Sequence, residues 1–148
     1  MIVKKLAAVC AAAVLALGLS AAPASATAVE WTWRNQATDH CLDFRADVGP
    51  YATDCNNGNY QLWIMTPGDD PTAMRQVATR LCLTVRNTVL TMKPCLAADQ
   101  AALWRPVPTT GPFYQLVSYV NPLNCVGEGP DRRVKLVTCT GGPSQQWQ

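Results

Sequence analysis

Residues 41–63 read CLDFRADVGPYATDCNNGNYQLW, and the spacing of their two cysteines and their tryptophan recurs twice further along the chain. Six cysteines follow residue 26, in three pairs whose members stand thirteen or fourteen positions apart: Cys41 and Cys55, Cys82 and Cys95, Cys125 and Cys139. A tryptophan comes eight or nine positions after the second cysteine of each pair, at Trp63, Trp104 and Trp147. These independent features keep one register, so the chain contains three repeats of about 42 residues each, at about 31–70, 71–109 and 110–148.

Shorter motifs follow the same period. The triplet Gln-x-Trp occurs at 61–63 and 145–147, and the middle copy reads Ala-Leu-Trp at 102–104. An arginine, an alanine and a threonine stand seven, four and three positions before the first cysteine in two repeats, at Arg34, Ala37 and Thr38 and at Arg75, Ala78 and Thr79. The repeat is therefore defined by several positions rather than by the cysteines alone.

The segment at 1–26 is typical of a cleaved signal peptide. Two lysines at 4–5 precede an apolar run at 6–19, and Ala24-Ser25-Ala26 supplies the small residues that a signal peptidase requires. We therefore expect a secreted, extracellular protein whose mature domain is 27–148. We expect Cys10 to be lost with the signal and the mature form to carry no membrane anchor.

The mature domain has no net charge. The segment at 1–26 contains two of the 12 Lys and Arg residues and none of the 10 Asp and Glu residues, so the domain keeps ten charges of each sign. A neutral domain has no general electrostatic attraction to nucleic acid or to anionic membranes. We expect neither as a partner.

Disulfides are the expected state of the six remaining cysteines in an exported chain. Six cysteines allow fifteen pairings, but the repeated spacing favours three equivalent local bridges, Cys41–Cys55, Cys82–Cys95 and Cys125–Cys139. The alternative is zinc ligation, which the sequence disfavours because it has no Cys-x-x-Cys pair and His40 is the only histidine. We expect no metal and no cofactor.

The local composition predicts strands rather than helices. The segments at 31–33, 77–85, 89–92, 114–120 and 134–137 are short, rich in β-branched or aromatic residues and bounded by Gly, Pro, Asn or Asp. A propeller requires at least about four blades, so three repeats cannot close one. Three repeats of about four strands can instead close an all-β barrel with pseudo-threefold symmetry. Its core would contain Trp63, Trp104 and Trp147.

The paired cysteines, the Cys-Leu-Asp at 41–43 and the Gln-x-Trp together resemble the ricin B-chain type β-trefoil lectins. The resemblance covers the chain from about residue 31 to residue 148 and implies a β-trefoil of twelve strands. It also implies that the cysteine pairs close external loops in which sugars are held. In that family, each sugar site combines an Asp two residues after the first cysteine, an aromatic ring and an amide beside Gln-x-Trp.

The resemblance implies at most one well-kept sugar site, in the first repeat. Asp43 occupies the acidic position and Gln61 the glutamine position. Thr53 stands at the stacking position, and Tyr51, two residues earlier on the same face of a strand, can replace it. Tyr60 stands where the family has the amide, next to Asn59.

The other two repeats lack these groups. The second has Thr84, Lys93 and the pair at 101–102 in place of the acid, the aromatic and the amides. The third has Gly127, Val137 and Ser144, although Gln145 is retained and Glu128 adjoins the acidic position as a substitute acid. We therefore place the candidate carbohydrate-binding residues at Asp43, Tyr51, Tyr60 and Gln61, with hydrogen bonding inside a turn as the structural alternative for Asp43.

Catalysis has little support in the sequence. His40 is the sole candidate general base and is expected to be an exposed or capping side chain, since it precedes a disulfide cysteine. No hydrolase, metalloprotease or phosphate-loop motif is present. Two hypotheses remain: a secreted carbohydrate-binding module for glycans or polysaccharide, and a degenerate trefoil that binds a protein partner, as a toxin accessory subunit or an inhibitor does.

Overall fold

The structure, a computed structural model, describes residues 28–66 and 71–148. The expected signal peptide at 1–26 lies outside the described residues. The described residues form twelve strands and two short 3-10 helices: β1 (Val29–Trp31), β2 (Cys41–Arg45), β3 (Gly49–Thr53), β4 (Trp63–Met65), β5 (Thr72–Ala73), β6 (Arg75–Gln76), β7 (Leu81–Arg86), β8 (Val89–Pro94), η1 (Gln100–Ala102), β9 (Leu103–Pro108), β10 (Tyr114–Ser118), β11 (Asn124–Glu128), β12 (Val134–Thr138) and η2 (Pro143–Gln145).

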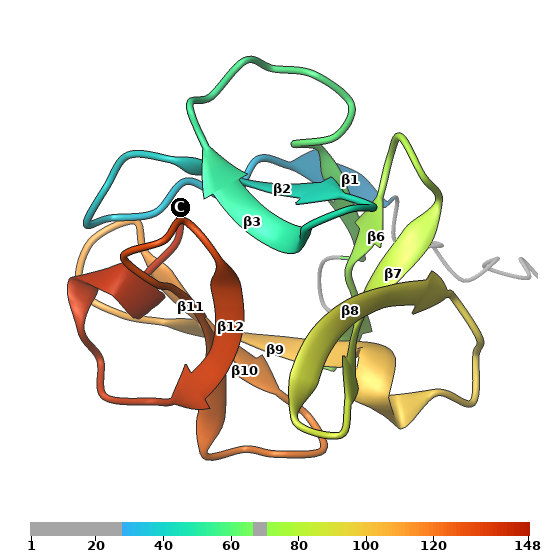
Figure 1. The fold of residues 1–148 in the computed structure, drawn as a ribbon. Coiled ribbons are helices and arrows are strands. Elements are labelled where there is room, and N and C mark those ends of the chain that lie inside the picture. Colours follow the sequence, from blue (N-terminus) through green and yellow to red (C-terminus); the bar gives the residue numbers. More distant parts are fainter. Residues whose placement is uncertain (1–27, 67–70) are drawn as a thin grey trace, which may run out of the picture.

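Three hairpins surround a common axis, one from each repeat (Figure 1). They are β2–β3, β7–β8 and β11–β12, and each is antiparallel. The first cysteine of each pair lies opposite the residue two positions before the second cysteine, in the pairs Cys41 with Thr53, Cys82 with Lys93 and Cys125 with Val137. The strands β3, β8 and β12 contact one another. The predicted threefold arrangement is therefore confirmed.

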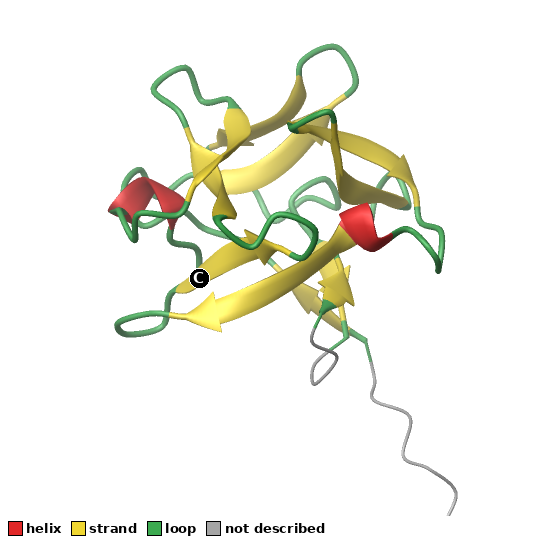
Figure 2. Ribbon diagram, turned by 90° about the horizontal axis from the view of Figure 1, so that it is seen from below, coloured by secondary structure: helices red, strands yellow, loops and turns green. Residues whose placement is uncertain are grey.

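The other strands join two of the hairpins in five-stranded sheets, and the segment after β1 pairs with residue 148. One sheet has the order β1-β4-β6-β7-β8 and another β12-β11-β10-β9-β5. The backbone N–H of Arg34 donates to the carbonyl of Gln148 at 2.8 Å, and the N–H of Gln148 donates back to Arg34 at 2.9 Å. Seen from below, the two 3-10 helices lie on opposite flanks (Figure 2). The all-β trefoil fold predicted from the sequence is confirmed.

The three repeat tryptophans occupy equivalent positions in the core. Each is fully buried. Each indole Nε1 donates to the backbone carbonyl of the residue after the first cysteine of its own repeat. The distances are 3.1 Å from Trp63 to Leu42, 2.9 Å from Trp104 to Leu83 and 3.0 Å from Trp147 to Val126. One hydrogen bond thus ties the end of each repeat to its hairpin and satisfies a polar atom that burial would otherwise leave unpaired.

All three predicted disulfides are present, one in each repeat. The Cα atoms of Cys41–Cys55, Cys82–Cys95 and Cys125–Cys139 are 5.1, 5.1 and 5.2 Å apart. Each bridge joins the first cysteine, in or beside the hairpin, to the loop that leaves the hairpin. In the chain-entropy model a closed loop of this length contributes about 3 kcal/mol.

The structure differs from three of the predicted strands, of which the one expected at 114–120 ends at Ser118. The strand expected at 31–33 ends at Trp31, and Trp33 is instead a core residue, 1% exposed, whose ring stacks on Trp31 at 5.5 Å. The strand expected at 77–85 begins only at Leu81. Residues 77–80 form a turn there, and Arg80 has a φ of 61° that no strand allows.

None of the helices in the described part of the chain has the length and apolar character needed to span a membrane.

Candidate functional site

A cavity of about 450 Å³ lies beside the hairpin of the first repeat. Its lining residues are Asp43, Phe44, Arg45, Ala46, Asp47, Tyr51, Asn56, Gly58, Tyr60 and Thr79. Three segments supply them: the β2–β3 hairpin, the loop that precedes Gln-x-Trp and the turn that precedes β7. The cavity therefore collects Asp43, Tyr51 and Tyr60, three of the four candidate site residues, at one place.

Asp43 and Tyr51 meet because of the hairpin register. Asp43 on β2 lies directly opposite Tyr51 on β3. Side chains of directly opposed residues in an antiparallel pair lie on the same face of the sheet. Burial raises the pKa of the Tyr51 hydroxyl, and the charge of the Asp43 carboxylate raises it further. Tyr51 therefore remains a neutral phenol that can donate to Asp43.

Gln61 lies behind Asp43 rather than in the cavity wall. It is fully buried, and its Nε2 donates to Asp43 Oδ2 at 3.0 Å and to the Asp54 carbonyl at 3.0 Å. Its Oε1 accepts from the backbone N–H of Asn56 at 2.8 Å. Gln61 thus fixes both the Asp43 carboxylate and the loop around Cys55.

The Asp43 carboxylate keeps spare acceptor capacity. Asp43 is only 3% exposed, and its Oδ1 accepts from the N–H of Phe44 at 2.6 Å. Gln61 donates to the other oxygen. A carboxylate has about four lone-pair positions, so capacity remains for a ligand hydroxyl even with Tyr51 as a third donor. The bond to Phe44 also means that Asp43 organises its own turn, so both interpretations of this residue have a structural basis.

Tyr60 is exposed at the cavity mouth, with 54% of its surface accessible. It comes from the loop at 56–60, where Asn57 has a φ of 57° and Gln61 N donates to the Gly58 carbonyl at 2.8 Å. An exposed ring held by a tight loop can present its face to the apolar side of a ligand.

An ion pair forms part of the rim. Arg45 donates to Asp47 through Nε at 3.1 Å and through Nη2 at 2.7 Å. The hydrogen bond from Arg45 is the main cause that lowers the pKa of the Asp47 carboxyl. Both side chains are more than half exposed. Because Asp47 binds the guanidinium, Arg45 is not directed at Asp43.

Several lining residues were not predicted from the sequence, among them Arg45, Asp47, Asn56 and Thr79. Thr79 had a signal, because it belongs to the Arg, Ala and Thr motif that precedes two of the first cysteines. The motif gave no indication that Thr79, in the second repeat, would line the cavity of the first.

In the second repeat, an ion pair crosses the space that corresponds to the first-repeat cavity. Thr84, at the acidic position, is fully buried and its hydroxyl donates to the Cys82 carbonyl at 3.0 Å. Arg86, four residues after Cys82 as Arg45 is after Cys41, forms an ion pair with Asp99. The hydrogen bond from Arg86 lowers the pKa of Asp99. The second repeat therefore has a buried hydroxyl where the first has a buried carboxylate, and an ion pair joins its hairpin to its loop.

In the third repeat side chains fill the equivalent space. A Cβ atom at Gly127 would lie 2.7 Å from Val137 Cγ2 and 3.4 Å from Gln145 Cγ. Gln145 keeps the role of Gln61 toward the loop, because it accepts from Thr140 N at 2.8 Å and donates to the Thr138 carbonyl at 2.8 Å. An acidic side chain at position 127 has no room.

We expect Gly127→Ala to lower the free energy of unfolding by about 1 to 2 kcal/mol, since the added methyl overpacks the contact with Val137. Urea unfolding followed by circular dichroism measures the change. Gly141→Ala is a useful comparison, because a Cβ there meets nothing within 4 Å and only its φ of 76° opposes the substitution. Unchanged stability of Gly127→Ala would show that Val137 moves aside freely.

Glu128 does not replace the missing acid of the third repeat. Its side chain is 2% exposed and contacts the first repeat, where Thr38 Oγ1 donates to Oε2 at 2.5 Å and His40 Nδ1 lies 2.7 Å from Oε1. His40 is therefore largely covered, with 18% of its side chain exposed, so it is not the exposed side chain that was one of the two alternatives expected from the sequence. The contacts of Glu128 with Thr38 and His40 join the first and third repeats.

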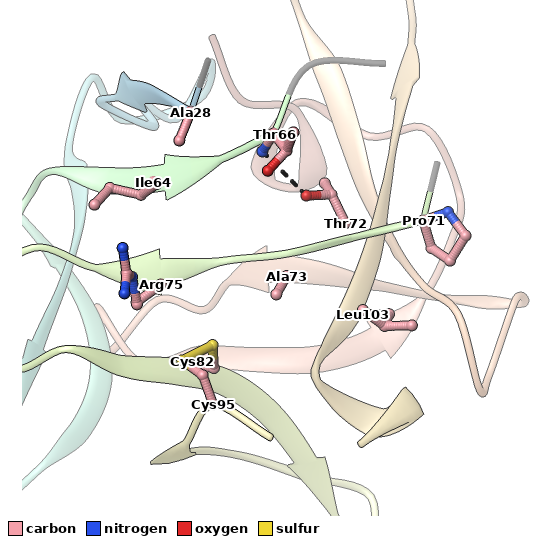
Figure 3. Close-up of a pocket in the computed structure, with 10 residues that line it drawn as sticks. All are labelled: Ala28, Ile64, Thr66, Pro71, Thr72, Ala73, Arg75, Cys82, Cys95 and Leu103. Atoms are coloured by element: carbon pink, nitrogen blue, oxygen red, sulfur yellow. Dashed lines mark hydrogen bonds between the residues drawn. A yellow bond between two sulfur atoms is a disulfide. The ribbon is translucent and has the colours of Figure 1, made fainter. Parts of the chain in front are cut away.

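A separate cavity of about 660 Å³ lies beside β4 and β5 (Figure 3). The Thr66 N–H donates to Thr72 Oγ1 across it at 3.2 Å. Among the ten residues drawn there, Arg75 is the only charged one, and none is aromatic or acidic. This cavity lacks the carboxylate and ring that the first-repeat cavity combines. Within the described ranges, no group of three or more His, Cys, Asp or Glu side chains could hold a metal ion.

Residues 31–147 match the family described as the ricin-type beta-trefoil lectin domain. The chain belongs to this family. The match covers all three repeats, including the two whose equivalent spaces are bridged or filled. No curated protein sequence matches the chain.

Solved structures share the fold of this lectin domain. The GlcNAcα1-4Gal releasing endo-β-galactosidase from Clostridium perfringens matches with a TM-score of 0.71 at 17% identity, over 80% of this chain and 31% of that one. The designed threefold symmetric protein ThreeFoil matches with a TM-score of 0.72 at 16% identity, over 80% of this chain and 96% of that one. The cytolethal distending toxin from Actinobacillus actinomycetemcomitans matches with a TM-score of 0.68 at 20% identity, over 80% and 88%.

These likenesses establish the trefoil fold of the lectin domain. They do not establish a shared ligand. The chain spans about a third of the endo-β-galactosidase, so the activity of that whole enzyme is not assigned to this chain.

Proposed function

We propose that this protein is a carbohydrate-binding module with one working site, the first-repeat cavity. The observation that carries the proposal is the pairing of the buried Asp43 carboxylate with the Tyr51 ring across one hairpin, at a cavity whose mouth carries Tyr60. A sugar has hydroxyls along its edge and C–H groups on its face. A carboxylate acceptor beside aromatic rings is complementary to both.

The size and rigidity of the cavity support this function. Small-molecule sites range from about 300 to 1,000 Å³, and this cavity of about 450 Å³ is near the lower end. Asp43 needs no rearrangement to accept a hydroxyl, because Gln61 and the Phe44 N–H already orient it. Oriented polar groups reduce the ordering cost of binding.

The same proposal includes export and a role in binding rather than catalysis. Three disulfides are typical of proteins that fold in an oxidising compartment, which supports secretion. The proposed partners are glycans or a polysaccharide outside the cell.

The test is binding to a panel of immobilised glycans. The protein should be biotinylated and displayed as a tetramer on streptavidin, because a single site binds weakly and multivalent display raises its avidity. We expect wild-type protein to bind a subset of glycans and Asp43→Asn to lose roughly tenfold to a hundredfold in affinity for them, as a hydrogen bond to a charged group is removed.

Asp39→Asn is the matched control. It makes the same chemical change on an exposed carboxylate that pairs with Arg34, and its φ of 60° suits asparagine. We expect this control to bind as the wild type does. Equal binding by Asp43→Asn and wild type would contradict the proposed site.

The alternative is a trefoil that binds a protein. The observation that favours it is the exposed apolar group on the loop after β10, where Tyr119, Val120 and Leu123 are 38%, 39% and 78% exposed. One neighbour in fold is a toxin, which agrees with an accessory-subunit role. Absence of binding to every glycan in the panel would favour this alternative.

A further inference from the structure

The turn that precedes β7 belongs to the second repeat and yet reaches the first-repeat cavity. Thr79 lines that cavity together with Tyr60 and Asp43. The Thr79 hydroxyl donates to Gln76 Oε1 at 2.9 Å and accepts from the Leu81 N–H at 3.3 Å. Thr79 is therefore held from both sides while one face borders the cavity.

Gln76 connects this turn to the loop that carries Tyr60. Its side chain is fully buried, and its Nε2 donates to the Tyr60 carbonyl at 2.6 Å. The same amide thus holds Thr79 through its oxygen and Tyr60 through its nitrogen. A buried amide with both ends satisfied resists displacement, since moving it would leave polar atoms unpaired.

Backbone contacts reinforce the same connection. The Ala78 N–H donates to the Asn59 carbonyl at 3.1 Å, and the Val77 N–H donates to the Leu62 carbonyl at 2.9 Å. The residues on either side of Tyr60 and Gln61 are thereby attached to the second repeat. The exposed Tyr60 ring stands on a loop whose backbone the next repeat fixes.

An equivalent contact occurs elsewhere without a binding site. Asn35 stands six residues before Cys41, as Gln76 does before Cys82, and its Nδ2 donates to the Ser144 carbonyl at 2.9 Å. Ser144 precedes the glutamine of the third Gln-x-Trp, as Tyr60 precedes that of the first. The same inter-repeat contact therefore serves only structure at Ser144, where the equivalent space is filled.

We propose that Gln76 is a positioning residue of the first-repeat sugar site, which it holds in shape by fixing Tyr60 and Thr79. This inference rests on the proposed function. It means that the second repeat, whose own equivalent space is bridged by Arg86 and Asp99, contributes to binding by completing the cavity of its neighbour.

The test is a double-mutant cycle between Gln76→Leu and Tyr60→Ala, measured on the glycans that the wild type binds. We expect each single variant to weaken binding by roughly tenfold, and the double variant to lose much less than the roughly hundredfold that independent effects would give, since Gln76 acts mainly through Tyr60 and only in part through Thr79. Thr79→Ser, which keeps the hydroxyl for Gln76, should bind better than Thr79→Val.

Asn35→Leu is the matched control. It removes the equivalent buried amide, so it should lower stability to urea about as much as Gln76→Leu does and leave glycan binding unchanged. Amide hydrogen exchange gives a readout that needs no ligand. Gln76→Leu should speed exchange at 56–61, whereas Asn35→Leu should speed it at 140–145.

Two results would overturn the inference while the proposed function stands. They are multiplicative effects in the cycle, and unchanged binding by Gln76→Leu while Asp43→Asn still weakens binding as expected. Unchanged exchange at 56–61 would overturn it whether or not any glycan binds. A wild type that binds no glycan would remove the proposed function and this inference together.

Discussion

Replacement of Trp104 by alanine is expected to lower the free energy of unfolding by about 3 to 5 kcal/mol. The Trp104 side chain is fully buried, so the substitution removes a large apolar contact and leaves a cavity in the core. It also removes the donor to the Leu83 carbonyl at 2.9 Å. Urea unfolding, followed by both fluorescence and circular dichroism, measures the loss.

Trp104→Phe separates packing from hydrogen bonding. Phenylalanine keeps much of the apolar volume but has no donor, so a loss of about 1 to 3 kcal/mol is expected from the unsatisfied Leu83 carbonyl and the smaller ring. Trp104 is not among the residues that line the first-repeat cavity, so glycan binding there should persist in both folded variants. A loss for Trp104→Ala no larger than that of an ordinary surface substitution would contradict a common tryptophan core.

The fold was predictable because its decisive features are local and repeated. In each repeat, two cysteines stand at a nearly constant interval and a tryptophan follows at a second nearly constant interval. The cysteines specify a hairpin and the disulfide that closes it, and the tryptophan anchors the repeat in the core. In each repeat the tryptophan Nε1 donates to the carbonyl of the residue after the first cysteine, always 21 positions earlier, so the spacing and this contact recur together. Because the three repeats are equivalent, they pack around one pseudo-threefold axis and form a single barrel.

The strand boundary near 77 was wrong because a turn there depends on backbone conformation. The apolar and β-branched residues at 77–85 favour a strand, but Arg80 adopts a φ of 61° and its N–H donates to the Gln76 carbonyl at 3.0 Å. An arginine carries no sequence signal for this conformation, unlike glycine or asparagine. Gln76 in this turn also donates to the Tyr60 carbonyl, a tertiary contact that the local sequence does not report.

The site was only partly predictable, because some of its residues are brought together by contacts within one repeat and others by contacts between repeats. Asp43 and Tyr51 could be placed together because alternation along a strand and the hairpin register are local. Thr79 reaches the cavity from the next repeat, and Glu128 meets His40 from 88 positions away. Such contacts depend on how repeats pack, which spacing within one repeat does not report.

Replacement of His40 by alanine is expected to lower the free energy of unfolding by about 2 to 4 kcal/mol. The Glu128 side chain is 2% exposed, and His40 Nδ1, 2.7 Å from Oε1, is one of the two donors that it meets. Removal of the imidazole leaves a buried carboxylate with Thr38 at its other oxygen. Asp54 and Arg132 lie farther out and are more than half exposed, so solvent screens them.

The second substitution Glu128→Gln should recover part of that loss. The amide carries no charge to leave uncompensated, and its oxygen still accepts from Thr38, so His40→Ala with Glu128→Gln should be more stable than His40→Ala alone. Glu128→Gln by itself should cost about 1 kcal/mol or less, because an amide can also donate to a neutral imidazole. Urea unfolding of the four proteins completes the cycle. Additive losses would mean that His40 stabilises the junction of the first and third repeats by packing alone, and not through the buried carboxylate.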